Sequence, residues 1–288
     1  MSRNLVQRIL FAVVAIPVAM VLVWFGGPAL ALLVAVAGVL GSAELLQFAR
    51  RQGLSPFPPA LAVASAGLPV LAWLANTNPS VAGWVDRWWT WGGAVWLLLI
   101  LVVTLARLSP QQRPLGSAAV TLLAPLYAAG LPAFLLTIRH ARFGERSIEG
   151  AALVFFPLVT VWVCDSVAMM VGKRVGGYKL APTVSPGKTW SGTIGGFVGA
   201  LAVAPLYRSL VLAPLGIELP LAAALVPAAL IGTLGQIGDL VESLFKREVG
   251  LKDSSHLIPG HGGVLDRLDS LYFAIPLAAL CYRLFGVI

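Results

Sequence analysis

The chain has 288 residues, of which 58% are hydrophobic and 11% are charged, and its mean hydropathy is +0.88. This composition excludes an ordinary soluble protein and indicates a polytopic protein with one helical membrane domain. The formal net charge of +8 does not indicate nucleic-acid binding, because the basic residues flank apolar stretches and do not gather on a polar domain.

Nine apolar stretches, each near the ~20 residues that cross a bilayer, predict an all-α fold. In chain order they cover residues 9–25, 29–48, 57–75, 92–106, 115–138, 151–171, 192–212, 219–244 and 264–287. The first is interpreted as an uncleaved helix and not as a secretory signal, because it is long for a signal core and more spans follow. The polar stretch 76–87 is predicted to lie outside the membrane. Residues 1–150 are predicted to be lipid-facing scaffold helices, and residues 151–288 the catalytic part of the same continuous membrane domain.

The distribution of basic residues predicts an N-terminus on the inner side. With nine spans, most of the lysines and arginines then fall on that side, as the positive-inside rule expects. Arg139, Arg142 and Arg146 oppose this orientation, because all three lie in one short outer loop. We expect an integral protein of a bacterial-type inner or plasma membrane, with its functional site at the cytoplasmic face.

Residues 243–269, SLFKREVGLKDSSHLIPGHGGVLDRLD, concentrate charged and histidine side chains beside apolar helices. Ionisable residues near a bilayer are costly, so such a cluster is typical of a functional site. Cations and bare backbone suit phosphate, whereas carboxylates suit a divalent metal. Gly262 and Gly263 remove side chains where a ligand would approach the backbone, and the apolar helix after them would direct its N-terminus at phosphate.

Carboxylates recur at the ends of three predicted helices. Asp266 and Asp269 are three residues apart, so both are predicted to face the same way. Asp239 and Glu242 have the same spacing, and Asp165 lies at the same predicted depth in another helix. Together with phosphate, such oxygen ligands typically hold Mg²⁺. The alternative, that these acids form structural salt bridges, stays open, with Arg174, Arg247 and Arg267 as the partners.

All five lysines lie in the two late loops, and lysine is a common point-charge binder of phosphate. The run 185–190, SPGKTW, resembles a Walker loop only superficially, because position 182 is Pro182 and no strand is predicted before the run. Ser185, Lys188 and Thr189 nevertheless suit a phosphate contact at the start of the seventh helix. For His261, phosphate donation, proton transfer and simple exposure stay open.

The block S-L-F-K-R-x4-K-D-x5-P-G-H-G-G-x2-D-R-x-D resembles the signature of the phosphatidate cytidylyltransferase family, the CDP-diacylglycerol synthases. Two further pieces agree with that family, namely C-D-S-x-A around Asp165, which leads to G-K-R-x-G-G, and the S-P-G-K-T-W run. Together they extend from Asp165 to Asp269, whereas the first 150 residues are only generically similar. Ser191 departs from the family pattern, which usually has glutamate there.

The resemblance implies that CTP and phosphatidate react to CDP-diacylglycerol and pyrophosphate with Mg²⁺, or with Mn²⁺ in its place. Such a step depends on positioning and charge neutralisation. The hypothesis assigns the metal to Asp239, Asp266 and Asp269, with Asp165 as a weaker fourth ligand. It assigns catalysis to these three aspartates with His261 and Lys252. It assigns substrate binding to Ser185, Lys188, Thr189, Lys246, Arg247, Gly262, Gly263 and Arg267.

Two other functions stay open. A CTP-dependent kinase, or a cytidylyltransferase of another lipid phosphate or a polyprenol, would use the same site with a different acceptor. A secondary transporter would also place carboxylates in the membrane, although no internal repeat supports it. The expected partners are CTP, phosphatidate and membrane lipid, without nucleic acid, and the sequence leaves a homodimer open.

Overall fold

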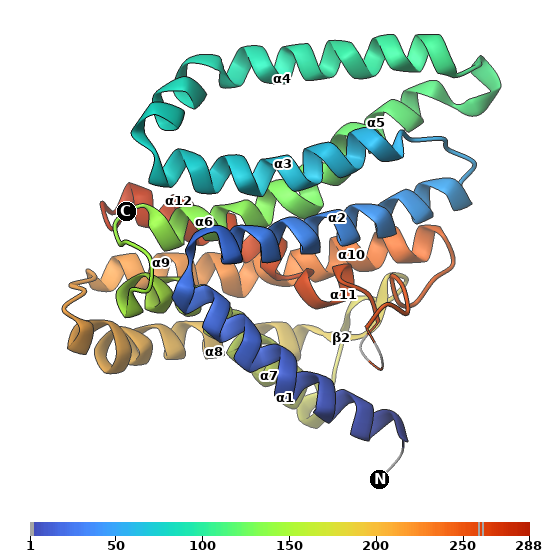
Figure 1. The fold of residues 1–288 in the computed structure, drawn as a ribbon. Helices are drawn as coiled ribbons and strands as arrows, with labels where there is room; N and C mark the ends of the chain where they lie inside the picture. Colours follow the sequence, from blue (N-terminus) through green and yellow to red (C-terminus); the bar gives the residue numbers. More distant parts are fainter. Residues whose placement is uncertain (1–2, 259, 261) are drawn as a thin grey trace.

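Long apolar helices make up most of this computed structural model, which describes residues 3–258, 260 and 262–288 (Figure 1). The helices are α1 Arg3–Phe25, α2 Gly27–Arg51, α3 Pro58–Thr77, α4 Pro79–Arg107, α5 Pro114–Pro125, α6 Leu131–His140, α7 Ile148–Val175, α8 Trp190–Tyr207, α9 Leu221–Leu230, α10 Gln236–Glu248, α11 Leu265–Leu268 and α12 Leu271–Leu284. The strands are β1 Lys179–Ala181 and β2 Ser185–Thr189.

Seven helical stretches of the described residues are long and apolar enough to cross a membrane, and they correspond to the second to eighth predicted spans. They are Gly27–Arg51, Pro58–Thr77, Pro79–Arg107, Pro114–His140, Ile148–Val175, Trp190–Leu215 and Leu221–Glu248. The all-α, polytopic membrane fold is therefore confirmed, whereas the count of nine is not. The first predicted span, 9–25, falls within α1 Arg3–Phe25. The predicted ninth span is interrupted at Asp269 and Ser270, so its apolar part begins only at Leu271.

The polar stretch 76–87 is mostly helical, because α3 ends at Thr77 and α4 begins at Pro79. The Asn78 side chain caps this helix by accepting hydrogen bonds from the backbone N–H groups of Ser80 (3.0 Å) and Val81 (3.3 Å). Pro79 occupies the first helical position, which suits its fixed φ. This start signal outweighs the polarity of the stretch. Figure 1 shows α4 at the edge of the molecule, beside α3 and α5.

Three membrane stretches contain a π-helical turn that begins within four residues of a proline. These turns cover Leu126–Gly130, Arg208–Leu212 and Ile231–Gly235, after Pro125, Pro205 and Pro227 respectively. Proline lacks the N–H that would bond four residues back, so the local hydrogen-bond pattern is disturbed there. The last turn joins α9 to α10, the helix that carries most of the candidate site.

The closest helix pair is α7 with α8, and glycines on α8 make it possible. A Cβ on Gly196 would lie 2.9 Å from the Ala168 Cβ and 2.9 Å from the Cys164 carbonyl oxygen, and one on Gly192 would lie 2.7 Å from the Ala168 carbonyl oxygen. Small residues at the start of α8 thus form a packing surface. It fixes the end of α7 against the start of α8.

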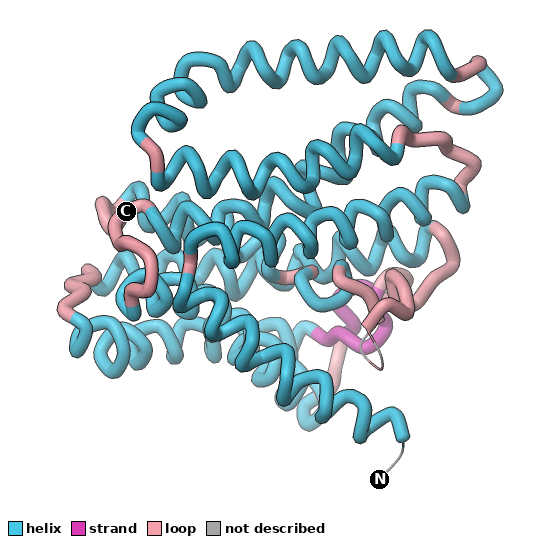
Figure 2. Tube along the Cα trace, viewed as in Figure 1, coloured by secondary structure: helices cyan, strands magenta, loops and turns pink. Residues whose placement is uncertain are grey.

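An antiparallel hairpin connects α7 to α8, in the segment for which the sequence predicted no strand. Lys179 pairs with Thr189, and Ala181 pairs with Ser185. The Ser191 hydroxyl donates to the Gly176 carbonyl oxygen and so ties the base of the hairpin to the end of α7. In Figure 2 the hairpin lies beside the loop that precedes α11. Ser191 therefore has a structural contact in the place where glutamate was expected.

The three arginines that opposed the predicted orientation make structural contacts. Arg139 is fully buried and donates to the carbonyl oxygens of Val23 (2.7 Å), Trp24 (2.7 Å) and Gly144 (2.8 Å). Arg146 lies over the Phe25 ring, and Arg142 donates to the backbone carbonyl oxygen of Val287 (3.5 Å). These side chains fasten α1, α6 and the C-terminus together, so they are poor indicators of which side the loop faces.

Candidate active site

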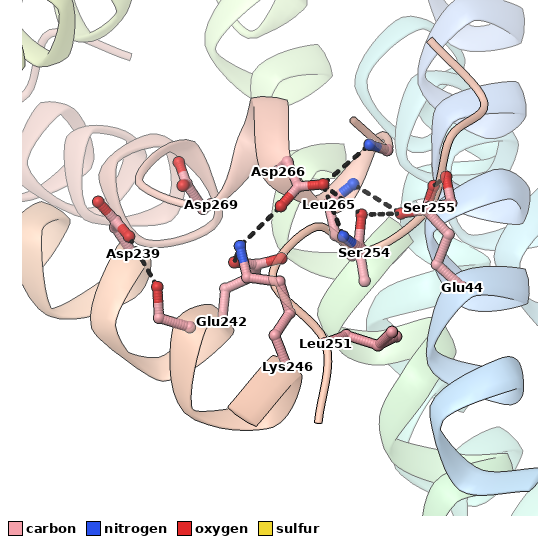
Figure 3. A network of polar contacts seen from close by, with 12 residues as sticks. Glu44, Asp239, Glu242, Lys246, Leu251, Ser254, Ser255, Leu265, Asp266 and Asp269 are labelled. Carbon is pink, nitrogen blue, oxygen red and sulfur yellow. Dashed lines mark hydrogen bonds and ion pairs between the residues drawn. The ribbon is translucent and has the colours of Figure 1, made fainter. Parts of the chain in front are cut away.

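A network of polar contacts joins α10, α11 and the loop before α11 (Figure 3). Asp266 is its centre, with 9% of its surface exposed. One oxygen, Oδ1, lies 2.6 Å from the Lys246 ammonium. The other, Oδ2, accepts hydrogen bonds from the N–H and hydroxyl of Ser254 (2.7 and 2.8 Å) and from the Gly263 N–H (2.8 Å). Both carboxylate oxygens are therefore occupied by donors of the protein.

Lys246 lies between two carboxylates and is itself buried. Its ammonium is 2.5 Å from Glu242 Oε2, one helical turn away on α10, and 2.6 Å from Asp266 Oδ1. The predicted salt bridges of the acids thus exist, but with a lysine and not with the arginines that the sequence suggested. A buried ammonium in such a pair is fixed by its partners, so Lys246 is not placed to bind phosphate here.

Asp266 and Asp269 do not face the same way, because α11 ends at Leu268. Asp269 points away from the Lys246 network, toward Asp239 on α10 (Figure 3). It lies before α12 and outside the membrane-length helices. Burial and then the negative charge of Asp239 raise the pKa of Asp269 to about 7, and Asp165 adds to the effect. Asp239, Asp269 and Asp165 therefore form one group of like charges, hereafter the acidic group.

The pKa of Asp266 is shifted in the opposite direction to that of Asp269. Burial alone would raise its pKa, but hydrogen bonds from Lys246 and from the Gly263 and Ser254 backbone hold the pKa of Asp266 below its ordinary value. An ionised, fully bonded Asp266 stabilises the loop around it. Among the described residues, Asp269 has a hydrogen-bond donor only for Oδ1, from the Ser270 N–H (2.6 Å).

Lys188 brings a cation to the acidic group from the end of β2. Its ammonium lies 2.8 Å from Asp239 Oδ2 and donates to the Gln236 carbonyl oxygen (3.3 Å). About a quarter of each side chain in this pair is exposed, 23% for Lys188 and 29% for Asp239. The pair is therefore accessible to a ligand, in contrast to the buried Lys246 pair.

The remaining predicted substrate-binding residues have mixed surroundings. Thr189 is buried and caps α8 by accepting from the Gly192 N–H (3.1 Å). Arg247 donates to the carbonyl oxygens of Val184 (3.1 Å) and Leu251 (2.7 Å), which ties the hairpin to the end of α10. Ser185 lies half-buried at the first position of β2, and Lys252 and Arg267 are exposed. His261 lies outside the described residues.

Gly262 and Gly263 allow the loop to pack closely around the carboxylates of Asp266 and Glu44. Gly262 has a φ of +83°, and a Cβ on it would lie 2.6 Å from Asp266 Oδ2. A Cβ on Gly263 would lie 2.0 Å from the Ser254 hydroxyl oxygen and 2.3 Å from Glu44 Oε1. The space that the sequence assigned to a ligand at these two positions is thus filled by protein oxygens.

The acidic group has the chemistry of a divalent-metal site without forming a complete cage. No three His, Cys, Asp or Glu side chains converge on one metal position within the part of the chain described. Mg²⁺ is commonly bound by one or two carboxylates, water and substrate phosphates, and not by an all-protein cage. Asp239 and Asp269 fit that pattern, whereas Asp266 does not, because its oxygens already have donors.

The family profile described as "Cytidylyltransferase family" matches residues 6–285. The chain belongs to the cytidylyltransferase family. It is similar to the phosphatidate cytidylyltransferase of Haemophilus influenzae, with 33% identity over 295 residues that cover 96% of this chain and 98% of the relative.

Two shorter matches within this family are more similar in sequence. The phosphatidate cytidylyltransferase of Brucella abortus biovar 1 is 47% identical over 165 residues, which is 57% of this chain and 56% of the relative. That of Bacillus subtilis is 40% identical over 137 residues, which is 48% of this chain and 49% of the relative. These two alignments thus span only about half of each relative.

Sequence reasoning missed one polar residue of this cytidylyltransferase-family site. Glu44 on α2 is only 3% exposed, and its carboxylate accepts four hydrogen bonds from residues 254–265. A signal was present, because Glu44 is the only acidic residue among the first 85 and lies in an apolar helix. An ionisable side chain in such a helix points to a function by default.

Proposed function

We propose that this protein is a phosphatidate cytidylyltransferase, which converts CTP and phosphatidate to CDP-diacylglycerol and pyrophosphate. The observation that carries the proposal is the accessible acidic group with Lys188, in a membrane protein that aligns over 96% of its length with a phosphatidate cytidylyltransferase. The group offers carboxylates and a cation at the end of apolar helices. A nucleotide and an anionic lipid headgroup require such a combination.

In the proposed reaction, a phosphate oxygen of phosphatidate attacks the α-phosphorus of CTP, a new P–O bond forms, and the bond to pyrophosphate breaks. Asp239 and Asp269 would hold the divalent ion, with Asp165 adding negative charge nearby. When bound, Mg²⁺ neutralises charge between the two polyanions. Lys188 lies where it can exchange its contact with Asp239 for a phosphate. A phosphate monoester has its second pKa near 6, so the nucleophile is largely ionised and needs no general base.

Four further charged residues near the site would support the reaction. Asp266 and Lys246 fix the loop, because each is engaged by the other. Lys252 and Arg267 are exposed cations that would meet the triphosphate or the headgroup. The acyl chains would stay in the bilayer, between helices. We place this site at the cytoplasmic face, where CTP is available and where the positive-inside rule puts the late loops.

The test measures product formation by the purified protein in mixed micelles with CTP, Mg²⁺ and phosphatidate. We expect pyrophosphate release and a lipid product with the mass of CDP-diacylglycerol. Asp269→Asn is expected to abolish both without loss of folded protein. Asp86→Asn, the same substitution at an exposed position of α4, is the matched control and should retain full activity.

Other outcomes would contradict the proposal in distinguishable ways. Turnover of CTP with a different lipid phosphate, and none with phosphatidate, would assign the site to another acceptor. Undiminished activity of the Asp269→Asn variant would overturn the metal assignment. A wild-type protein that consumes no CTP with any lipid phosphate and any divalent cation would overturn the proposed function itself.

A further inference from the structure

Glu44 is the polar residue through which the first half of the chain contacts the candidate site. Its Oε1 accepts hydrogen bonds from the Ser255 hydroxyl (2.7 Å) and the Val264 N–H (2.9 Å). Its Oε2 accepts from the Ser254 hydroxyl (2.9 Å) and the Leu265 N–H (2.9 Å). All four donors lie more than 200 residues away along the chain, so the contact is purely tertiary.

The chemistry of these contacts requires a carboxylate. A buried charge is tolerated only when it is well hydrogen-bonded. Glu44 Oε1 has two donors, and Oε2 has the Leu265 N–H and a share of the Ser254 hydroxyl, whose single proton also faces Asp266 Oδ2. Hydrogen bonds to an ionised acceptor are about twice as strong as neutral ones. Val264 and Leu265 supply N–H groups at the start of α11, which have no partner within that helix. A glutamine would present an NH₂ group to some of these donors and lose their bonds.

The contacts of Glu44 reach Asp266 and, through α11, the chain that leads to Asp269 of the acidic group. The Ser254 hydroxyl lies between Glu44 and Asp266, 2.9 Å from one carboxylate and 2.8 Å from the other. Gly263 leaves no free space beside them, since even a Cβ there would overlap Glu44 Oε1 at 2.3 Å. Asp269 follows α11 directly. A shift of α11 away from Glu44 would therefore displace Asp269 from Asp239.

We infer that Glu44 is a positioning residue, which holds Ser254, Ser255 and α11 on α2 so that Asp269 is placed opposite Asp239. The inference rests on the proposed function for the reaction that this placement serves. It assigns to the first half of the chain a part in the site, beyond the scaffold role expected from the sequence. The binding residues of the site are Asp239 on α10, Asp269 after α11 and Lys188 on the hairpin, and Glu44 acts on Asp269 only through the loop and α11.

The test compares Glu44→Gln with Ser42→Ala on the same helix. Ser42 is 2% exposed and Glu44 is 3% exposed, but the Ser42 hydroxyl bonds to Ser65 (2.7 Å) and to the Ala124 carbonyl oxygen (3.2 Å), away from the loop. Misplacement of a reacting group by about 1 Å can lower a rate ~100-fold. We expect Glu44→Gln to lower kcat to that extent with the KM for phosphatidate nearly unchanged, and Ser42→Ala to leave kcat unchanged.

A second measurement does not depend on activity. Hydrogen exchange of the detergent-solubilised protein should show faster exchange of peptides from residues 254–268 in Glu44→Gln, and unchanged exchange there in Ser42→Ala. Ser255→Ala should accelerate the same peptides, with less than an additive effect when combined with Glu44→Gln, because both variants break the same contact.

Each result decides the inference. Unchanged exchange of residues 254–268 in Glu44→Gln would overturn it, whatever the activity. Equal losses of kcat in Glu44→Gln and Ser42→Ala would also overturn it, because α2 would then act only as general scaffold. If the wild-type protein forms no CDP-lipid, the proposed function fails, and exchange still decides whether Glu44 positions the loop and α11.

Discussion

Asp266 and Asp269 are separated by two residues, yet they have different electrostatic surroundings. Asp266 accepts bonds from an ammonium, a hydroxyl and two backbone N–H groups. Asp269 lies near Asp239 and Asp165, with one backbone donor. The break in the helix at Asp269 turns the two carboxylates apart. Asp266 stabilises the fold. Asp269 is repelled by the neighbouring aspartates, and a bound cation would relieve this repulsion.

This difference predicts opposite effects of the same substitution on stability. Removing one partner of a buried ion pair typically costs about 3–5 kcal/mol, so Asp266→Asn should lower the free energy of unfolding by about 3 kcal/mol. Asp269→Asn should leave it unchanged or increase it. Denaturant unfolding in detergent without divalent cations measures both. A destabilised Asp269→Asn would contradict the assignment of Asp269 to a group of like charges.

The raised pKa of Asp269 predicts how the free energy of unfolding depends on pH. The carboxyl of an unfolded chain ionises near pH 3.9, whereas burial and Asp239 raise the pKa of Asp269 in the fold to about 7. Between those values the unfolded state releases the proton first, so this group lowers stability as the pH rises through that window. Asp269→Asn should therefore be more stable than wild type at pH 8 and equal to it at pH 4. Equal stabilities at both pH values would contradict the raised pKa.

At the scale of the elements, the sequence predicted the features that depend on local pattern. Apolar length predicted the membrane helices. The hairpin was not predicted, because the Ser185–Thr189 run contains Pro and Gly and its pairing is fixed by its neighbours. The break in the last span was missed for a related reason. The start of α11 is held by Glu44, a contact between distant parts of the chain that the local pattern does not show.

The α7–α8 contact permits a test of how tightly the elements must pack. An alanine at position 196 would bring its Cβ within 2.9 Å of the Ala168 Cβ and of the Cys164 carbonyl oxygen. Overpacking typically costs about 1–3 kcal/mol, and we expect Gly196→Ala to lower the free energy of unfolding by that amount. Gly67→Ala in α3 is the matched control, because a Cβ there meets no atom within 4 Å. Alanine raises helix propensity by up to about 1 kcal/mol, so this control should be neutral or stabilising.

At the scale of the whole molecule, the two halves are not separable. One hydrophobic core extends from Val23 in α1 to residue 287 at the C-terminus, and Glu44 and Arg139 add polar contacts between distant segments. Sequence reasoning placed the chemistry in residues 151–288, as far as the family signature extends, and that assignment stays a prediction. It could not assign a role to Glu44 and Arg139 in the first half, because the partners of both side chains are remote in the sequence.

Arg139, Arg142 and Arg146 make structural contacts, so their charges do not decide how the protein is oriented in the membrane. Cysteines introduced at exposed positions can test the orientation. Gly144, in the loop that carries Arg142 and Arg146, and Gly187, in the hairpin, are both exposed with no atom within 4 Å of a built Cβ. One membrane-length helix, α7, separates them. In a background with the two native, buried cysteines replaced by alanine, an impermeant maleimide should label Gly144→Cys on intact cells. It should label Gly187→Cys only after permeabilisation. The reverse pattern would place the acidic group on the outer face, away from cytoplasmic CTP, and would contradict the proposed location of the site.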